Sequence, residues 1–172
     1  RKMTEGTQKI NGFREVPANE ILAKIENGDT VEYYGVNING DLDLGKINLP
    51  KKTIEDLHWL LKKLGHKADE YNVVAASIKI MNSKIEGAVE FGKAIFKESI
   101  SFIGTEFGHK AEFQESIFHH NAQFSGSQFK LANFSDAIFH EGAFFDSVLF
   151  DIANFVGAQF DLIAEFNNSF IA

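Results

Sequence analysis

The sequence predicts an all-β solenoid of stacked, four-sided coils, with a short N-terminal helix and one inserted helix. Three observations support this prediction: 18 of the 172 residues are Phe, large apolar residues recur in steps of five or six, and a small residue stands two places before most of them. A helix does not produce this pattern, because a step of five rotates around the helix face. One core environment repeated along an axis does produce it.

The first element expected along the chain is a helix over residues 17–27. Pro17 suits its first turn, Gly28 follows its end, and Ile21, Leu22 and Ile25 share one face. Because the end coil of a solenoid exposes its core, a cap is needed there. We therefore assign residues 1–32 to an N-terminal segment whose helix caps the solenoid, and residues 33–172 to the solenoid itself.

The solenoid phase starts early and is then interrupted. Ile38, Leu44 and Leu49 step by six and five, after which the pattern stops until Val74. The interruption, at about residues 50–72, contains a predicted helix over 53–64, with a capping Thr53 and a terminating Gly65. Its apolar stripe needs a surface on which to dock.

The main run of core residues continues to the end of the chain. Six-residue steps at 74–80, 96–102, 118–124, 139–145 and 160–166 occur once per coil, whereas those at 85–91 and 107–113 have no successor after Phe129. One corner should therefore keep an extra residue throughout, and the opposite corner should lose it, so that the coil period shortens from 22 to 21 residues. The core positions are Ile80, Ile85, Phe91, Phe96, Phe102, Phe107, Phe113, Phe118, Phe124, Phe129, Phe134, Phe139, Phe145, Phe150, Phe155, Phe160, Phe166 and Ile171.

Two runs point to a known family. Residues 132–136 (Ala-Asn-Phe-Ser-Asp) and 153–157 (Ala-Asn-Phe-Val-Gly) resemble the A-(N/D)-(L/F)-x-x unit of pentapeptide-repeat proteins. The resemblance covers residues 33–49 and 73–172, and it implies a right-handed quadrilateral β-helix with Phe stacked along its axis. The six-residue steps and the interruption after Leu49 depart from the family pattern.

Composition excludes several classes of function. The chain has no Cys, so a disulfide framework, a thiolate metal site and a thiol nucleophile are excluded. The lack of Cys leaves the compartment open, with a cytoplasmic location favoured. Residues 73–172 hold 6 Lys, no Arg and 12 Asp plus Glu, a net charge of 6 − 12 = −6, so direct nucleic-acid binding is not expected. No apolar run is long enough for a membrane span.

The clearest polar cluster is a column of histidines. His119 and His140 follow core residues at the same corner, one coil apart, with His120 beside them, and Lys97 and Asp161 continue the column. A zinc site would need three or four converging ligands, whereas this corner should be convex and solvated. No nucleophile–base pair or phosphate loop is apparent. We therefore expect no catalytic, cofactor or metal residues.

Candidate contact residues lie at outward positions. Ile95, Ile117 and Ile138 form an apolar row that either contacts a partner or is covered by the inserted helix. Outward acidic residues, Glu90 and Glu112, are candidate contacts on another face. The complete candidate interaction surface is Ile95, Ile117, Ile138, Phe144, Leu149 and Phe170.

The expected function is a non-catalytic structural scaffold or protein-interaction module. Its partner should be another protein, whose identity the sequence leaves open. The C-terminal coil, with its open strand edges, should either pair with a second copy of the chain or continue into further sequence beyond Ala172. The family resemblance implies an alternative, an acidic DNA mimic that inhibits or protects a type II topoisomerase (gyrase). Scatter of the acidic residues over several faces, and repeat phase up to Ile171 in place of a C-terminal helix, favour the scaffold.

Overall fold

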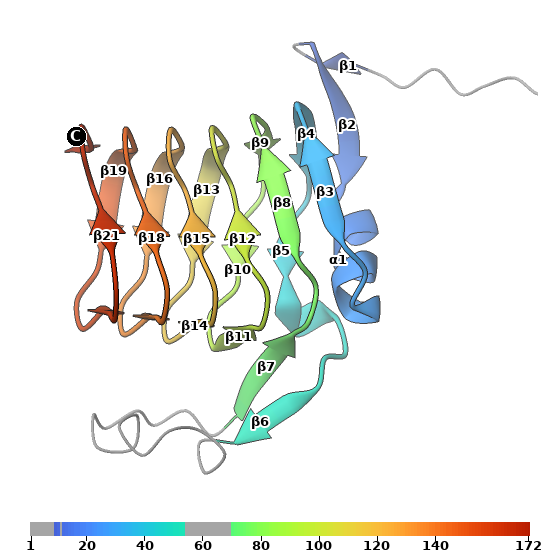
Figure 1. Ribbon diagram of the computed structural model, residues 1–172. Coiled ribbons are helices and arrows are strands. Elements are labelled where there is room, and N and C mark those ends of the chain that lie inside the picture. Colours follow the sequence, from blue (N-terminus) through green and yellow to red (C-terminus); the bar gives the residue numbers. More distant parts are fainter. Residues whose placement is uncertain (1–8, 11, 54–69) are drawn as a thin grey trace, which may run out of the picture.

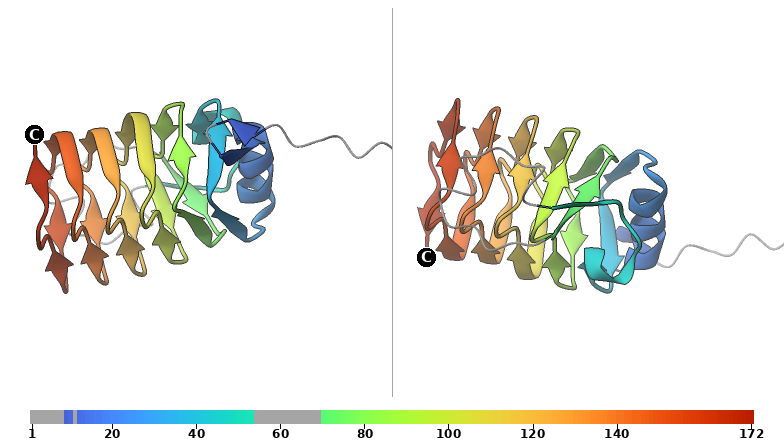
Figure 2. Two further views of the ribbon diagram at one scale, coloured as in Figure 1. Left: turned by 90° about the horizontal axis from the view of Figure 1, so that it is seen from above. Right: turned by 90° about the horizontal axis from the view of Figure 1, so that it is seen from below.

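The computed structural model describes residues 9, 10, 12–53 and 70–172. These residues wind into coils stacked along one axis, with helix α1 (Ala18–Asn27) at one end and Ala172 at the other (Figure 1, Figure 2). The predicted all-β solenoid and its N-terminal helix are confirmed. The predicted inserted helix falls almost wholly on residues 54–69, which lie outside the described residues.

Two sides of the coil are six-stranded sheets. The β14 face contains β6 (Lys51–Thr53), β7 (Glu70–Val74), β11 (Ala94–Phe96), β14 (Ile117–Phe118), β17 (Ile138–Phe139) and β20 (Gln159–Phe160). The β15 face contains β3 (Val31–Tyr34), β8 (Ile78–Met81), β12 (Ile100–Ser101), β15 (Ala122–Gln123), β18 (Ala143–Phe144) and β21 (Ala164–Glu165). All neighbours in these two sheets are parallel except β6, which is antiparallel to β7.

The other two sides belong to one ten-stranded sheet that bends around a corner. It contains β1 (Lys9–Ile10), β2 (Phe13–Pro17), β4 (Val36–Asn39), β5 (Leu42–Asp43), β9 (Lys84–Ile85), β10 (Val89–Glu90), β13 (Glu106–Glu112), β16 (Gln128–Asn133), β19 (Leu149–Asn154) and β22 (Phe170–Ile171). A short 3₁₀ helix, Leu44–Lys46, follows β5.

The predicted change of coil period is confirmed at a single bulge. Phe107 lies opposite Phe129, 22 residues on, but Lys110 lies opposite Leu131, 21 residues on. The extra residue of β13 is therefore accommodated between Phe107 and Lys110. The next pair, β16 and β19, keeps an unbroken register around the same corner.

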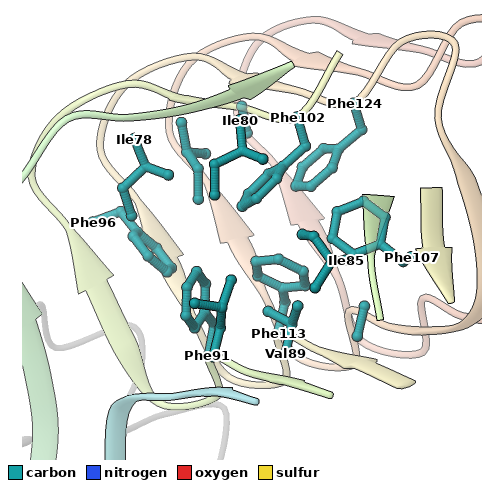
Figure 3. Close-up of a cluster of buried hydrophobic side chains, with 14 of the residues drawn as sticks. Ile78, Ile80, Ile85, Val89, Phe91, Phe96, Phe102, Phe107, Phe113 and Phe124 are labelled. Carbon is teal, nitrogen blue, oxygen red and sulfur yellow. The ribbon is translucent and has the colours of Figure 1, made fainter. Parts of the chain in front are cut away.

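Phe rings fill the interior in four columns. Within a column, successive rings are stacked, with centroids 4.3 to 5.7 Å apart and interplanar angles of 2 to 14°. The exception is Phe91, whose ring meets that of Phe113 edge-on at 5.7 Å and 89°. Strand spacing near 4.8 Å places identical rings at stacking distance. Toward α1 the core becomes aliphatic, and Figure 3 shows Ile78, Ile80, Ile85 and Val89 beside the first Phe rings.

Two opposite corners turn through left-handed backbone. One has Asn82 (φ 49°), Gly104, Gly126, Ser147 and Asn168, and the other has Lys93, Glu115, Asp136 and Gly157. At most of these corners the amide three residues after a core Phe donates to the carbonyl of that Phe, for example Thr105 to Phe102 at 3.1 Å. The positive φ lets five-residue steps close into a square coil.

The helix α1 closes the aliphatic end of the core. Ala18, Ile21, Leu22 and Ile25 are buried against the first coil, and Gly28 ends the helix in the left-handed conformation (φ 75°). Tyr33 Oη donates to Glu20 Oε2 at 2.6 Å and so ties the helix to β3. The preceding strand β2, which the repeat pattern does not predict, pairs with β4 and extends the bent sheet by one further strand.

Candidate functional site

The row of outward isoleucines is buried. Ile95, Ile117 and Ile138 are only 3, 3 and 4% exposed, and they form a second apolar cluster with Tyr71 and Val73, outside the coil. They are in register on β11, β14 and β17. Of the two alternatives for this row, contact with a partner or cover within the chain, the burial favours cover within the chain. The helix that was expected to provide this cover lies outside the described residues.

Tyr71 anchors this second cluster from β7. Its side chain is fully buried, and its hydroxyl has no hydrogen-bond partner in the described part of the chain. Burial, followed by the negative charges of Glu115 and Asp136, raises the pKa of Tyr71 to about 12. The hydroxyl therefore stays protonated and imposes a desolvation cost on the fold.

We expect Tyr71→Phe to raise the free energy of unfolding at neutral pH by up to about 1 kcal/mol, since it removes an unpartnered buried hydroxyl. The folded pKa of about 12 exceeds the unfolded value of about 10. As the pH rises, Tyr71 therefore loses its proton in the unfolded state before it does so in the folded state. The difference between the two pKa values stabilises the folded state in full below about pH 10, and this stabilisation is lost between about pH 10 and 12.

Urea denaturation of wild type and Tyr71→Phe at neutral and at alkaline pH checks this expectation. The variant should lose less stability on going to high pH, whereas Tyr34→Phe, which changes an exposed side chain, should behave as wild type does. An equal alkaline loss in wild type and Tyr71→Phe would contradict the buried position of the hydroxyl.

The other predicted contact residues differ in exposure. Phe144 is half-buried, whereas Leu149 and Phe170 are 39 and 66% exposed. Eight of the nine exposed large apolar side chains in the described part of the chain lie within residues 149–171. They are Leu149, Ile152, Val156, Leu162, Ile163, Phe166, Phe170 and Ile171. The exposed apolar surface is thus concentrated on the last described coil.

The acidic candidates lie in register but are engaged within the rod. Glu90 lies opposite Glu112 in the neighbouring coil. Glu90 Oε1 is 2.6 Å from Lys110 Nζ, and Glu112 Oε2 accepts a hydrogen bond from Asn133 Nδ2 at 2.8 Å. Two further Lys–Glu pairs, Lys84–Glu106 and Lys93–Glu115, also join neighbouring coils.

The predicted histidine column is present at the corner between the β14 face and the β15 face. The rings of His119 and His140 are 5.4 Å apart, and His140 Nδ1 is 2.6 Å from Asp161 Oδ2. Burial alone would raise the pKa of Asp161, but hydrogen bonds from Gln159 and His140 outweigh burial and lower that pKa. Beside this column, His120 Nδ1 is 3.3 Å from Glu141 Oε1.

The histidine column borders, at its Lys97 and His119 end, a cavity that the repeat pattern did not reveal. Its volume is about 160 Å³, and Lys52, Val73, Ile95, Lys97, His119 and His120 line it. Lys52 reaches it from β6, which pairs with β7 so that Lys52 lies opposite Tyr71. Only the column position of Lys97, His119 and His120 was predictable, because Lys52 belongs to the interruption.

The described residues contain no group of three or more His, Asp or Glu side chains placed to hold a metal ion. In the same part of the chain, no helix combines the length and the apolar character that crossing a membrane requires.

The geometry defines the class of this protein as a four-sided β-solenoid with a stacked Phe core. Residues 82–128 match the sequence model of a family described as pentapeptide repeats (9 copies). Over residues 82–128 the chain therefore has the predicted pentapeptide repeats, and its coil continues on both sides of the matched residues. No curated protein and no solved structure matches the chain.

Proposed function

We propose that this chain is a non-catalytic scaffold that binds a protein partner through its last described coil, and that the partner is a second copy of the same chain. The observation that supports this proposal is the concentration of exposed apolar side chains on residues 149–171. Exposed apolar patches of this kind are typical of interaction surfaces.

The coil also presents unpaired strand edges. In the described part of the chain, β20, β21 and β22 each pair with a neighbour on one side only. An edge of this kind is a template for pairing with another strand. A second copy turned about a two-fold axis would place the same four-sided edge and the same Phe columns against it, which gives a self-complementary interface.

The charges do not favour the DNA-mimic alternative. Such a mimic needs acidic side chains free to face a partner, whereas Glu90, Glu106 and Glu115 each pair with a lysine of an adjacent coil. Internal neutralisation of this kind weakens any continuous negative stripe along the rod.

The experiment is the solution mass by light scattering of wild type and of a Phe166→Ser, Phe170→Ser double variant. We expect wild type to be a dimer and the double variant a monomer. Phe166 stacks on Phe145 at 4.9 Å, so the exposed pair Leu162→Ser, Ile163→Ser provides a second test that leaves this stack intact. Tyr34→Ser, an exposed aromatic change near the other end of the rod, is the control and should remain dimeric.

A monomeric wild type would overturn the second copy as the partner. A dimer unaffected by both the double variant and the Leu162, Ile163 pair would place the interface elsewhere, and would equally overturn the proposal.

A further inference from the structure

The cavity at the histidine corner differs in charge from the rest of the rod. The cavity has a volume of about 160 Å³, and Val73 and Ile95 form an apolar wall. Its other lining residues are all basic: Lys52, Lys97, His119 and His120. This cationic group stands out on a repeat region whose net charge is −6. Its members come from three separate elements: β6, and the residues that follow β11 and β14.

The arrangement of charge between coils shows the contrast. Elsewhere, neighbouring coils place opposite charges together, as in Lys84–Glu106, Lys93–Glu115 and Glu90–Lys110. Here Lys97 and His119 occupy the same position of successive coils, where the His119 amide donates to the carbonyl of Phe96 at 3.1 Å. A protonated His119 would therefore place a like charge opposite Lys97, which is destabilising.

The described residues supply no compensating carboxylate to Lys52, Lys97 or His119. The ion pairs of this region belong to the next coils, where Glu141 lies beside His120 and Asp161 beside His140. Glu98, next to Lys97 in sequence, is not among the residues that line the cavity. Within the described part of the chain, the two lysine ammonium groups and the His119 imidazole at the cavity therefore have no fixed counter-charge.

We propose that this cavity binds the phosphate group of inorganic phosphate or of a phosphorylated small molecule. A phosphate offers several strong acceptor oxygens, which matches the donors of Lys52, Lys97 and the two imidazoles. The volume is below that of a site for a drug-sized ligand and suits a single charged group. This proposal does not depend on the protein-binding role of the last coil.

Protonation of His119 couples to binding. Partial burial, then the positive neighbours His140, His120, Lys52 and Lys97, lowers the pKa of His119, so its imidazole is neutral at neutral pH. A bound dianion offsets those positive neighbours and favours the imidazolium. By reciprocity, anion affinity increases as the pH falls below the ordinary histidine value of about 6.5.

The test is side-chain NMR of the histidines during titration with sodium phosphate, at constant ionic strength maintained with sodium chloride. We expect saturable shifts of His119 and His120, while His109, at the bulge of β13, provides an internal control. Lys97→Gln and Lys52→Gln should each weaken binding about tenfold, as loss of one charge-assisted contact predicts. Lys130→Gln, an exposed lysine change on β16, is the matched control and should leave the affinity unchanged.

Two further measurements identify the source of the phosphate group and test the coupling between anion binding and protonation of His119. Tighter binding of phenyl phosphate than of inorganic phosphate would identify a phosphorylated small molecule, and equal or weaker binding would identify the free ion. Sulfate, whose own charge is constant over this pH range, should bind more tightly as the pH falls, and His119→Gln should remove that dependence. Non-saturable shifts, equal shifts of His109, or a Lys97→Gln affinity equal to that of Lys130→Gln would overturn the site.

Discussion

Replacing Phe124 by alanine is expected to lower the free energy of unfolding by about 3 to 5 kcal/mol. Phe124 is fully buried and stacks between Phe102 and Phe145, at 5.7 and 5.1 Å. Phe113 and Phe134 meet it edge-on at 5.6 and 5.3 Å. The substitution removes a ring from the middle of a column, and the neighbouring coils cannot close the space because their separation is fixed by backbone pairing.

Urea denaturation followed by far-ultraviolet circular dichroism measures this loss. The matched control is Phe166→Ala, in the same column but 40% exposed on the last described coil, which should cost clearly less. Because each coil contacts only its neighbours, the variants should also differ in the cooperativity of the transition. Equal losses for Phe124→Ala and Phe166→Ala would mean that the column does not act as a packed core.

Much of this fold could be predicted from the sequence, because one spacing rule determines both the backbone path and the core. The alternation of five and six residues located the corners, and the missing step after Phe129 located the bulge that the structure places between Phe107 and Lys110. Strand β2 was not predictable in this way. It contains no repeat unit, and its pairing with β4 depends on contacts distant in sequence.

The site was predictable only where it follows the repeat. The positions of Lys97, His119 and His140 follow from the coil period, so their column was expected and is present. Lys52 joins them through antiparallel pairing of β6 with β7, near the two ends of the interruption, and no periodicity specifies that register. The repeat left open whether the isoleucine row is covered for a related reason, because an outward position in the repeat does not reveal a second layer.

Replacing Ile117 by aspartate is expected to lower the free energy of unfolding by about 3 to 5 kcal/mol, the cost of an unpaired charge in an apolar interior. Ile117 lies between Ile95 and Ile138 and is 3% exposed. Tyr34→Asp is the matched control, since Tyr34 is 54% exposed and lies outside residues 149–171, and its effect should stay within about 0.5 kcal/mol.

Urea denaturation of the two aspartate variants distinguishes two roles for the isoleucine row. If the row were a surface held open for a partner, Ile117→Asp would cost no more than Tyr34→Asp, and partner binding alone would be lost. A large cost confined to Ile117→Asp would show that the row belongs to a second core. The exposed apolar contacts of the rod would then be those of residues 149–171, where the proposed interface lies.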